Sequence, residues 1–160
     1  MTYIDTSSVA QAQISTQAMA PGGRHPRNAL VVLLRDDSGT AGAIADICDF
    51  LDLHLLCLDN GQELDETLAT MRPMAVISSI DAAGQDGCHT LMQVAQRDAS
   101  LPVMMITGSD PRHCGAVDAV EEVFALTHLS KRARLPTPGD LVDFLAMAGR
   151  AGQCLDLLPI

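Results

Sequence analysis

The chain has 160 residues, about half of them apolar, which suits one globular domain with a substantial core. Its 20 acidic and 10 basic residues give a formal net charge of −10, which disfavours a nucleic-acid-binding surface. The first twenty residues lack the basic segment and apolar run of a signal peptide, and no stretch approaches the roughly 18 apolar residues of a membrane span.

Short apolar runs alternate along the chain with segments whose apolar residues recur at helical spacing. Residues 1–27, rich in Ser, Thr, Gln and Ala, are predicted to form a flexible tail, and 28–150 the domain. The predicted strands are 29–34, 55–58, 74–79 and 102–107. The predicted helices are 41–51, 62–71, 88–100, 114–126 and 139–150. A fifth strand is expected within 124–135, where the polar run THLSKRARL leaves its position open.

Residues 151–160 form an apolar C-terminal tail that we expect to fold back onto the domain, with a contact to a partner or a second copy as the alternative. The five cysteines are far apart and contain no C-x-x-C motif, so we interpret them as reduced thiols, mostly in the core, of a cytoplasmic protein. They are Cys48, Cys57, Cys88, Cys114 and Cys154.

The alternation predicts an α/β fold of the (βα)₅ type, a doubly wound parallel sheet. We expect it to be flavodoxin-like, with the strand order 2-1-3-4-5 that is common among such sheets. In such sheets, functional residues lie beyond the carboxyl ends of the strands. The polar residues expected at those ends are Arg35, Asp36, Asp37, Ser79, Thr107 and the segment 131–134.

Residues 28–150 resemble the receiver domain of two-component response regulators. The resemblance is carried by these strand ends, by the loop Gln85-Asp86-Gly87, by the step Thr107-Gly108 and by the sequence PTPGDL before the last helix. It implies that strand one ends in an acidic pair that holds Mg²⁺ and strand three in the aspartate that accepts a phosphoryl group. It also implies Thr or Ser after strand four, and Lys followed by Pro after strand five.

Several of these positions depart from the family pattern. The acidic pair falls on Arg35 and Asp36, and the phosphoacceptor position falls on Ser79. Lys131, the only lysine of the chain, lies near the position of the family lysine but is not followed by proline. Arg134 fits the spacing to the last helix better, so both residues remain candidates.

These departures predict that phosphotransfer fails. The family reaction needs a carboxylate nucleophile, whereas Ser79 offers a neutral hydroxyl. Mg²⁺ prefers carboxylate oxygens, and Arg35 brings a permanent positive charge to the cluster, where we expect it to pair with Asp36 or Asp37 in the place of the metal. We therefore interpret the cluster as a degenerate phosphorylation site with no catalytic residue, metal or cofactor. Its positions are Arg35, Asp36, Asp37, Ser79, Thr107 and Lys131.

Three alternatives stay open. Asp81, two residues beyond Ser79, is the nearest other acceptor of a phosphoryl group. The pairs Cys88-His89 and His113-Cys114 could meet at a metal or redox site, although their spacing is not that of zinc ligands. A small flavodoxin-like ligand-binding protein is the third, although the chain lacks a G-x-G-x-x-G phosphate loop.

The function that this pattern favours is that of a stand-alone, degenerate receiver-like domain in bacterial signal transduction. Because the chain ends soon after the predicted last helix, we expect it to act as a protein-interaction module rather than through an output domain of its own. Lys131, Arg132 and Arg134 form the one concentrated basic segment and are the predicted partner-binding residues. The identity of the partner and a homodimer are left open.

Overall fold

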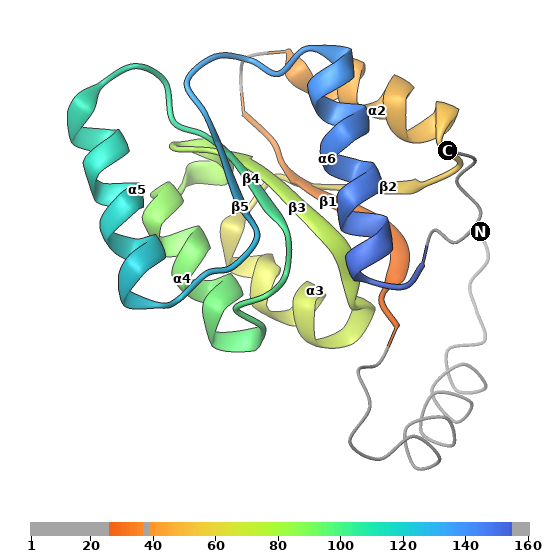
Figure 1. Cartoon of the computed structure of the whole chain (residues 1–160), viewed down its shortest axis with the longest axis horizontal. Coiled ribbons are helices and arrows are strands. Elements are labelled where there is room, and N and C mark those ends of the chain that lie inside the picture. The colour runs from red at the N-terminus through yellow and green to blue at the C-terminus, as the bar shows by residue number, and fades with distance from the viewer. Residues whose placement is uncertain (1–25, 37–38, 155–160) are drawn as a thin grey trace.

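A five-stranded parallel sheet forms the centre of the molecule, with helices on both faces (Figure 1). The computed structural model describes residues 26–36 and 39–154, so most of both predicted tails and Asp37 lie outside the described residues. The strand order is β2-β1-β3-β4-β5, which confirms the predicted topology. The strands are β1 Asn28–Leu34, β2 His54–Leu58, β3 Pro73–Ser79, β4 Val103–Ile106 and β5 Leu129–Arg132.

The helices divide between the two faces of the sheet. Helices α2 and α6 contact each other on one face, and α3, α4 and α5 pack in sequence on the other. Their bounds are α2 Thr40–Phe50, α3 Leu64–Met71, α4 Gly87–Arg97, α5 Pro111–Val123 and α6 Pro138–Ala151. Two single-turn 3₁₀ helices, η1 Gly61–Glu63 and η2 Ala82–Gly84, lie in the loops after β2 and β3. Within the described part of the chain, no helix is long and apolar enough to cross a membrane.

The apolar runs of the strands supply two cores, one on each face of the sheet. Val31 and Leu33 of β1 pack under α2 and α6, whereas Val32 and Leu34 pack under the other three helices. Side chains of a strand alternate between faces, so a central parallel strand must be apolar at nearly every position. This is why ALVVLL predicted a buried strand so clearly.

Local capping residues fix the starts of the helices that border the carboxyl edge of the sheet. The Asp110 side chain accepts from the backbone N–H of Arg112, and Pro111 takes the first helical position, so α5 begins three residues before the predicted Cys114. In α6, Thr137 and Asp140 form a reciprocal capping box. Both features orient the loops that follow β4 and β5.

The fifth strand is short and polar because it forms an edge of the sheet. Its residues Leu129–Arg132 pair only with β4, and none of its side chains is fully buried. Edge strands commonly carry charged residues, which hinder pairing with other chains. The polar sequence of β5 therefore gives no apolar run by which the strand could be recognised, unlike the buried strand β4 beside it.

Candidate functional site at the carboxyl edge of the sheet

Asp36 and Ser79 meet at the carboxyl edge, beyond β1 and at the end of β3. The Ser79 hydroxyl donates to Asp36 Oδ2 at 2.7 Å, and Asp81 Oδ1 lies 3.4 Å from Ser79 Oγ. A hydroxyl has one proton to donate, so the shorter contact to Asp36 is the stronger one. Ser79 is only 9% exposed, which shields this hydrogen bond from water. The neutral hydroxyl thus sits against the one carboxylate that the sequence retains from the predicted acidic pair.

Arg35 does not take the place that the sequence analysis gave it. Its Nε lies 3.4 Å from Asp59 Oδ1, just beyond β2, and about half of its side chain is exposed. A hydrogen bond with Cys57, followed by the charge of Asp59, raises the pKa of the guanidinium. Arg35 lies beside Asp59 because its backbone continues the pairing of β1 with β2: the Arg35 N–H donates to the Leu58 carbonyl. The predicted pairing with Asp36 is therefore replaced by one toward β2, and Asp37 lies outside the described residues.

Thr107 follows β4 and has its own local partners. Its hydroxyl donates to the Gly108 carbonyl at 2.9 Å and lies 3.6 Å from Cys114 Sγ, in the first turns of α5. Its backbone N–H donates to the Arg132 carbonyl at 2.8 Å. These contacts join the end of β4 to β5 and α5, and they keep a largely buried hydroxyl satisfied.

Lys131 lies on the opposite face of the sheet from Ser79. In the parallel register, Ser79 is aligned with Ile106 and Arg132, whereas Ser78 is aligned with Met105 and Lys131. Aligned residues share a face, and adjacent residues of a strand do not. The prediction that Lys131 belongs to the same cluster as Ser79 is therefore wrong by one residue along β5. Arg132 is the cation of β5 that lies on the Ser79 face.

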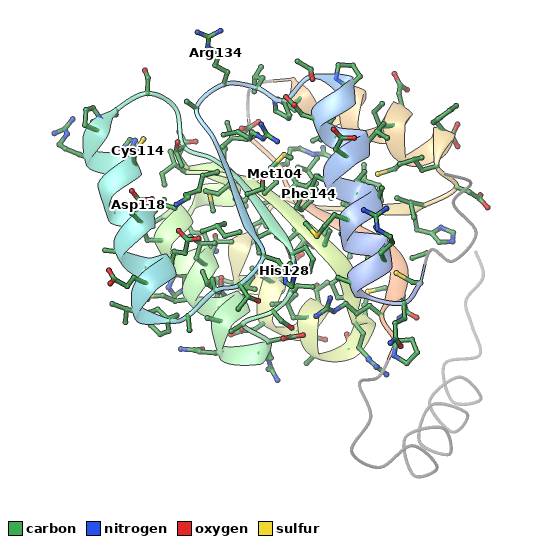
Figure 2. All side chains as sticks on the ribbon, in the orientation of Figure 1. Met104, Cys114, Asp118, His128, Arg134 and Phe144 are labelled. Carbon is green, nitrogen blue, oxygen red and sulfur yellow. The ribbon has the colours of Figure 1, made fainter. Side chains whose placement is uncertain are left out.

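Lys131 and Arg132 each pair with acids of the helix that covers their own face of the sheet. Lys131 Nζ donates to Asp118 at 2.8 Å and to Glu121 at 2.6 Å, both on α5, and these hydrogen bonds raise its pKa. Arg132 Nη1 lies 3.8 Å from Asp140 Oδ1 at the start of α6. Figure 2 shows that Arg134 extends outward from the loop between β5 and α6. The three predicted partner-binding residues thus point in different directions.

A cavity of about 450 Å³ opens beside Asp81, between the loop after β3 and the helices α4 and α5. Asp86, Cys88 and His113 also line it. Burial, followed by the charge of Asp86, raises the pKa of the Cys88 thiol, which favours its protonated form. One member of each Cys/His pair therefore faces this cavity, whereas Cys114 contacts Thr107. Among residues 26–36 and 39–154, no three His, Cys, Asp or Glu side chains are grouped to hold a metal ion.

Two groups of curated proteins resemble the chain in sequence, although no family model matches it. It is 33% identical over 90 residues to the C4-dicarboxylate transport transcriptional regulatory protein DctD of Pseudomonas aeruginosa, covering 56% of this chain and 20% of that protein. It is 29% identical over 122 residues to the DNA-binding transcriptional regulator NtrC of Escherichia coli, covering 76% and 24%. The chain thus spans about a fifth to a quarter of the length of these relatives.

Several solved structures with a similar fold are receiver domains. The beryllofluoride-activated NtrC receiver domain superposes with a TM-score of 0.56 at 23% identity, covering 78% of this chain and 96% of that one. The signal receiver domain of a histidine kinase from Syntrophus aciditrophicus gives a TM-score of 0.62 at 16% identity, covering 82% and 97%. The homologues and structural neighbours therefore agree on the receiver fold, and they bear out the fold that the sequence resemblance predicted.

Proposed function

From the receiver fold of two-component signalling, we propose that this chain is a degenerate receiver domain that acts as a phosphorylation-independent protein-interaction module. The observation that carries the proposal is the 2.7 Å hydrogen bond from Ser79 to Asp36. It supports the proposal because it engages a neutral hydroxyl at the end of β3, where the sequence resemblance leads us to expect the carboxylate nucleophile of a receiver. Signalling through such a site would depend on the surface of the domain rather than on its phosphorylation.

The surroundings of Ser79 do not supply the activation that a serine nucleophile needs. A hydroxyl must lose its proton to a base whose pKa lies near the working pH. Among the described residues, the side-chain acceptors within reach of Ser79 Oγ are the carboxylates of Asp36 and Asp81, and no imidazole or amine is among them. Asp36 Oδ2 already accepts a hydrogen bond from Ser79, and the serine hydroxyl adds no negative charge for a Mg²⁺ ion. The cluster is best explained as a static polar network.

The proposed interaction surface is formed by α5, β5 and α6. The strand β5 is at the edge of the sheet and lies between the two helices in Figure 1. It carries Lys131, Arg132 and Arg134, and an acidic partner would be attracted to it. Lys131 and Arg132 already face acids of this chain. Arg134 is exposed and forms no ion pair within the described part of the chain, so we assign it the largest share of partner attraction.

The full chain, immobilised and exposed to extract of its native cell, tests this function. We expect capture of a specific partner that is unchanged by Ser79→Ala and by prior treatment with a small phosphodonor. The double variant Arg132→Glu, Arg134→Glu should weaken capture, more strongly at low salt. Arg150→Glu, at the far end of α6, is the matched control. Equal capture by the wild type and the double variant would exclude this surface.

Phosphorylation of Asp81 is the second candidate function. Asp81 lies 3.4 Å from Ser79 Oγ and lines the 450 Å³ cavity, so a small phosphodonor could reach it. Against it, Asp81 lies beyond the end of β3, displaced from the strand end itself. Intact-mass spectrometry after incubation with a small phosphodonor, compared between the wild type and Asp81→Asn, separates this candidate from the interaction module.

A further inference from the structure

A second cavity, of about 500 Å³, lies at the amino edge of the sheet, opposite the Ser79 cluster. Arg27 precedes β1, Pro73 begins β3 and Leu101 precedes β4, and all three line it. The last turns of α3 and α4 complete the wall with Leu68 and Arg97. The cavity is thus assembled from segments that are far apart in the sequence.

The lining of this cavity is positively charged on an acidic protein. Three of the ten basic residues of the chain line it, namely Arg27, Arg72 and Arg97, against the single acid Asp98. Three positive charges less one negative charge leave a formal charge of +2. A chain with a net charge of −10 therefore concentrates positive charge in one concave site.

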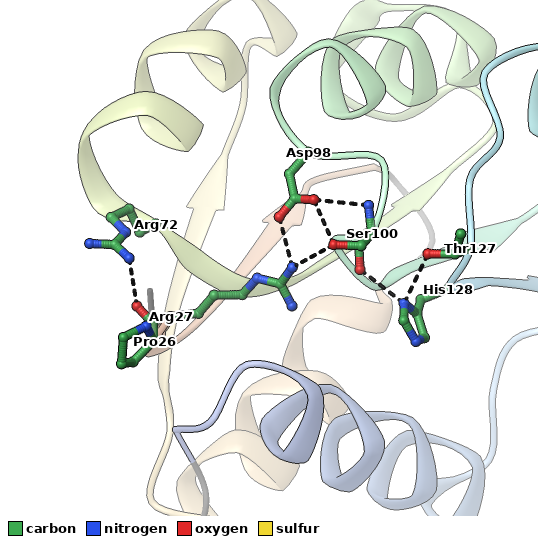
Figure 3. Close-up of polar contacts among 7 residues, drawn as sticks. All are labelled: Pro26, Arg27, Arg72, Asp98, Ser100, Thr127 and His128. Carbon is green, nitrogen blue, oxygen red and sulfur yellow. Dashed lines mark hydrogen bonds and ion pairs between the residues drawn. The ribbon is translucent and has the colours of Figure 1, made fainter. Parts of the chain in front are cut away.

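Arg27 is the buried member of the three. Its side chain is 9% exposed, and its Nη2 donates to Asp98 Oδ2 at 2.7 Å and to Ser100 Oγ at 3.1 Å (Figure 3). Its Nη1 is also buried but has no hydrogen-bond partner among the described residues. This unsatisfied donor is a cost to the fold, and the two bonds of Nη2 fix the position of the guanidinium in the lining. The sequence analysis put Arg27 in the flexible tail, whereas the structure anchors it to the domain.

Asp98 neutralises only one of the three guanidinium groups. Burial alone would raise the pKa of this carboxyl, but hydrogen bonds from Ser100 and Arg27 outweigh it and lower the pKa. Asp98 is therefore ionised at neutral pH and is already engaged by Arg27 and Ser100. It contributes a single negative charge and leaves the other two arginines uncompensated within the lining.

Arg72 and Arg97 keep donors available. Arg72 Nη2 donates to the Pro26 carbonyl at 2.9 Å, which orients its side chain at the end of α3 (Figure 3). A guanidinium has five N–H donors, so most of those of Arg72 are left for another acceptor. Arg97 is exposed in the last turn of α4 and is free to adjust to a ligand.

We propose that this cavity binds a small dianion of the phosphate monoester class. The +2 lining matches the charge of such a group, and planar guanidinium forks match its oxygens. Leu68, Pro73 and Leu101 provide an apolar wall for the organic part of the ligand. The volume falls within the range of ordinary small-molecule sites. This site is independent of the function proposed for the carboxyl edge and would add a ligand input at the opposite end of the domain.

Isothermal titration of the full chain with phenyl phosphate, in a phosphate-free buffer at constant ionic strength, tests the site. We expect saturable binding and a rise in melting temperature with ligand concentration. Arg97→Gln should weaken binding about tenfold, because it removes one charge-assisted contact. Arg97 makes no hydrogen bond that supports the fold in the described residues, so this variant should fold normally. Arg112→Gln, at the start of α5 and far from this cavity, should bind like the wild type.

The same titration has outcomes that would overturn the proposal. These are no binding, equal binding by the wild type and Arg97→Gln, or binding of succinate as tight as that of phenyl phosphate. Backbone amide shifts measured by NMR locate the ligand independently. Shifts centred on Arg72 and Ser100 are expected, whereas shifts centred on Ser79 and Asp81 would place the anion at the carboxyl edge and exclude this cavity.

Discussion

Ser79 and Asp36 are joined by a 2.7 Å hydrogen bond across 43 residues of sequence. The bond connects the end of β3 to the residue that follows β1, and it ties together the two strand ends at the centre of the carboxyl edge. In a receiver, this is where a phosphoryl group and a divalent cation would be gathered. Here the Ser79 hydroxyl and the Asp36 carboxylate link the two strand ends directly.

Removing this hydroxyl should destabilise the fold measurably. We expect Ser79→Ala to lower the free energy of unfolding by about 1–2 kcal/mol, because a largely buried hydrogen bond to a charged acceptor is lost. Chemical denaturation measures the change. Thr70→Ala is the control, since it removes an exposed hydroxyl that bonds the Glu66 carbonyl within α3. Equal effects of the two substitutions would mean that the Ser79 bond contributes nothing special.

The affinity for Mg²⁺ should increase with each acidic residue that is introduced at positions 79 and 35. Ser79→Asp restores one carboxylate but leaves the charge of Arg35 at the end of β1. We therefore expect the double variant Arg35→Asp, Ser79→Asp to bind Mg²⁺ more tightly than Ser79→Asp alone, and the wild type to show no thermal stabilisation at millimolar Mg²⁺. Thermal melts with Mg²⁺ and with matched Na⁺ make the comparison. An identical Mg²⁺ response of the single and double variants would show that Arg35 has no influence.

The ion pairs of Lys131 should contribute modestly and only while the amine is charged. The side chain is partly exposed, so we expect Lys131→Gln to cost less than about 1 kcal/mol at pH 7. Hydrogen bonds to Asp118 and Glu121 raise the pKa of Lys131 in the folded state. Its stabilisation is therefore fully present below the unfolded-state pKa and is lost as pH rises through the higher folded-state value. Denaturation at pH 7 and above pH 11 should show the difference between the proteins shrinking, and a growing difference would contradict this account.

The fold was readable from the sequence because central parallel strands are apolar throughout. ALVVLL and MAVISS were predicted to be buried strands, and their alternation with amphipathic helices predicted the parallel sheet that the structure has. The polar edge strand β5 was located only within a broad segment. Its four residues carry no periodicity that fixes a register, and a shift of one residue exchanges the two faces.

The details of the site depended on such registers and on tertiary pairing. The sequence predicted that Asp36 and Ser79 would share the carboxyl edge, and the structure places them in direct contact. It could not show that Arg35 turns toward Asp59, because that depends on the register of β1 against β2 and on the direction of the Arg35 side chain. The amino-edge cavity was missed altogether. Its arginines lie on three separate segments, and the only available signal was the concentration of Arg around a few strand starts.

Intact-mass spectrometry of the full chain after incubation with acetyl phosphate and Mg²⁺ tests the central claim most directly. Because Ser79 lacks a carboxylate nucleophile and an effective base, we predict a single unmodified mass. Mass analysis at neutral pH retains an acyl phosphate, and a receiver domain with its acceptor aspartate serves as the positive control for the reagent. An adduct of about 80 Da on this chain, lost in Asp81→Asn or in Ser79→Ala, would show that phosphotransfer persists and would contradict the interaction-only account.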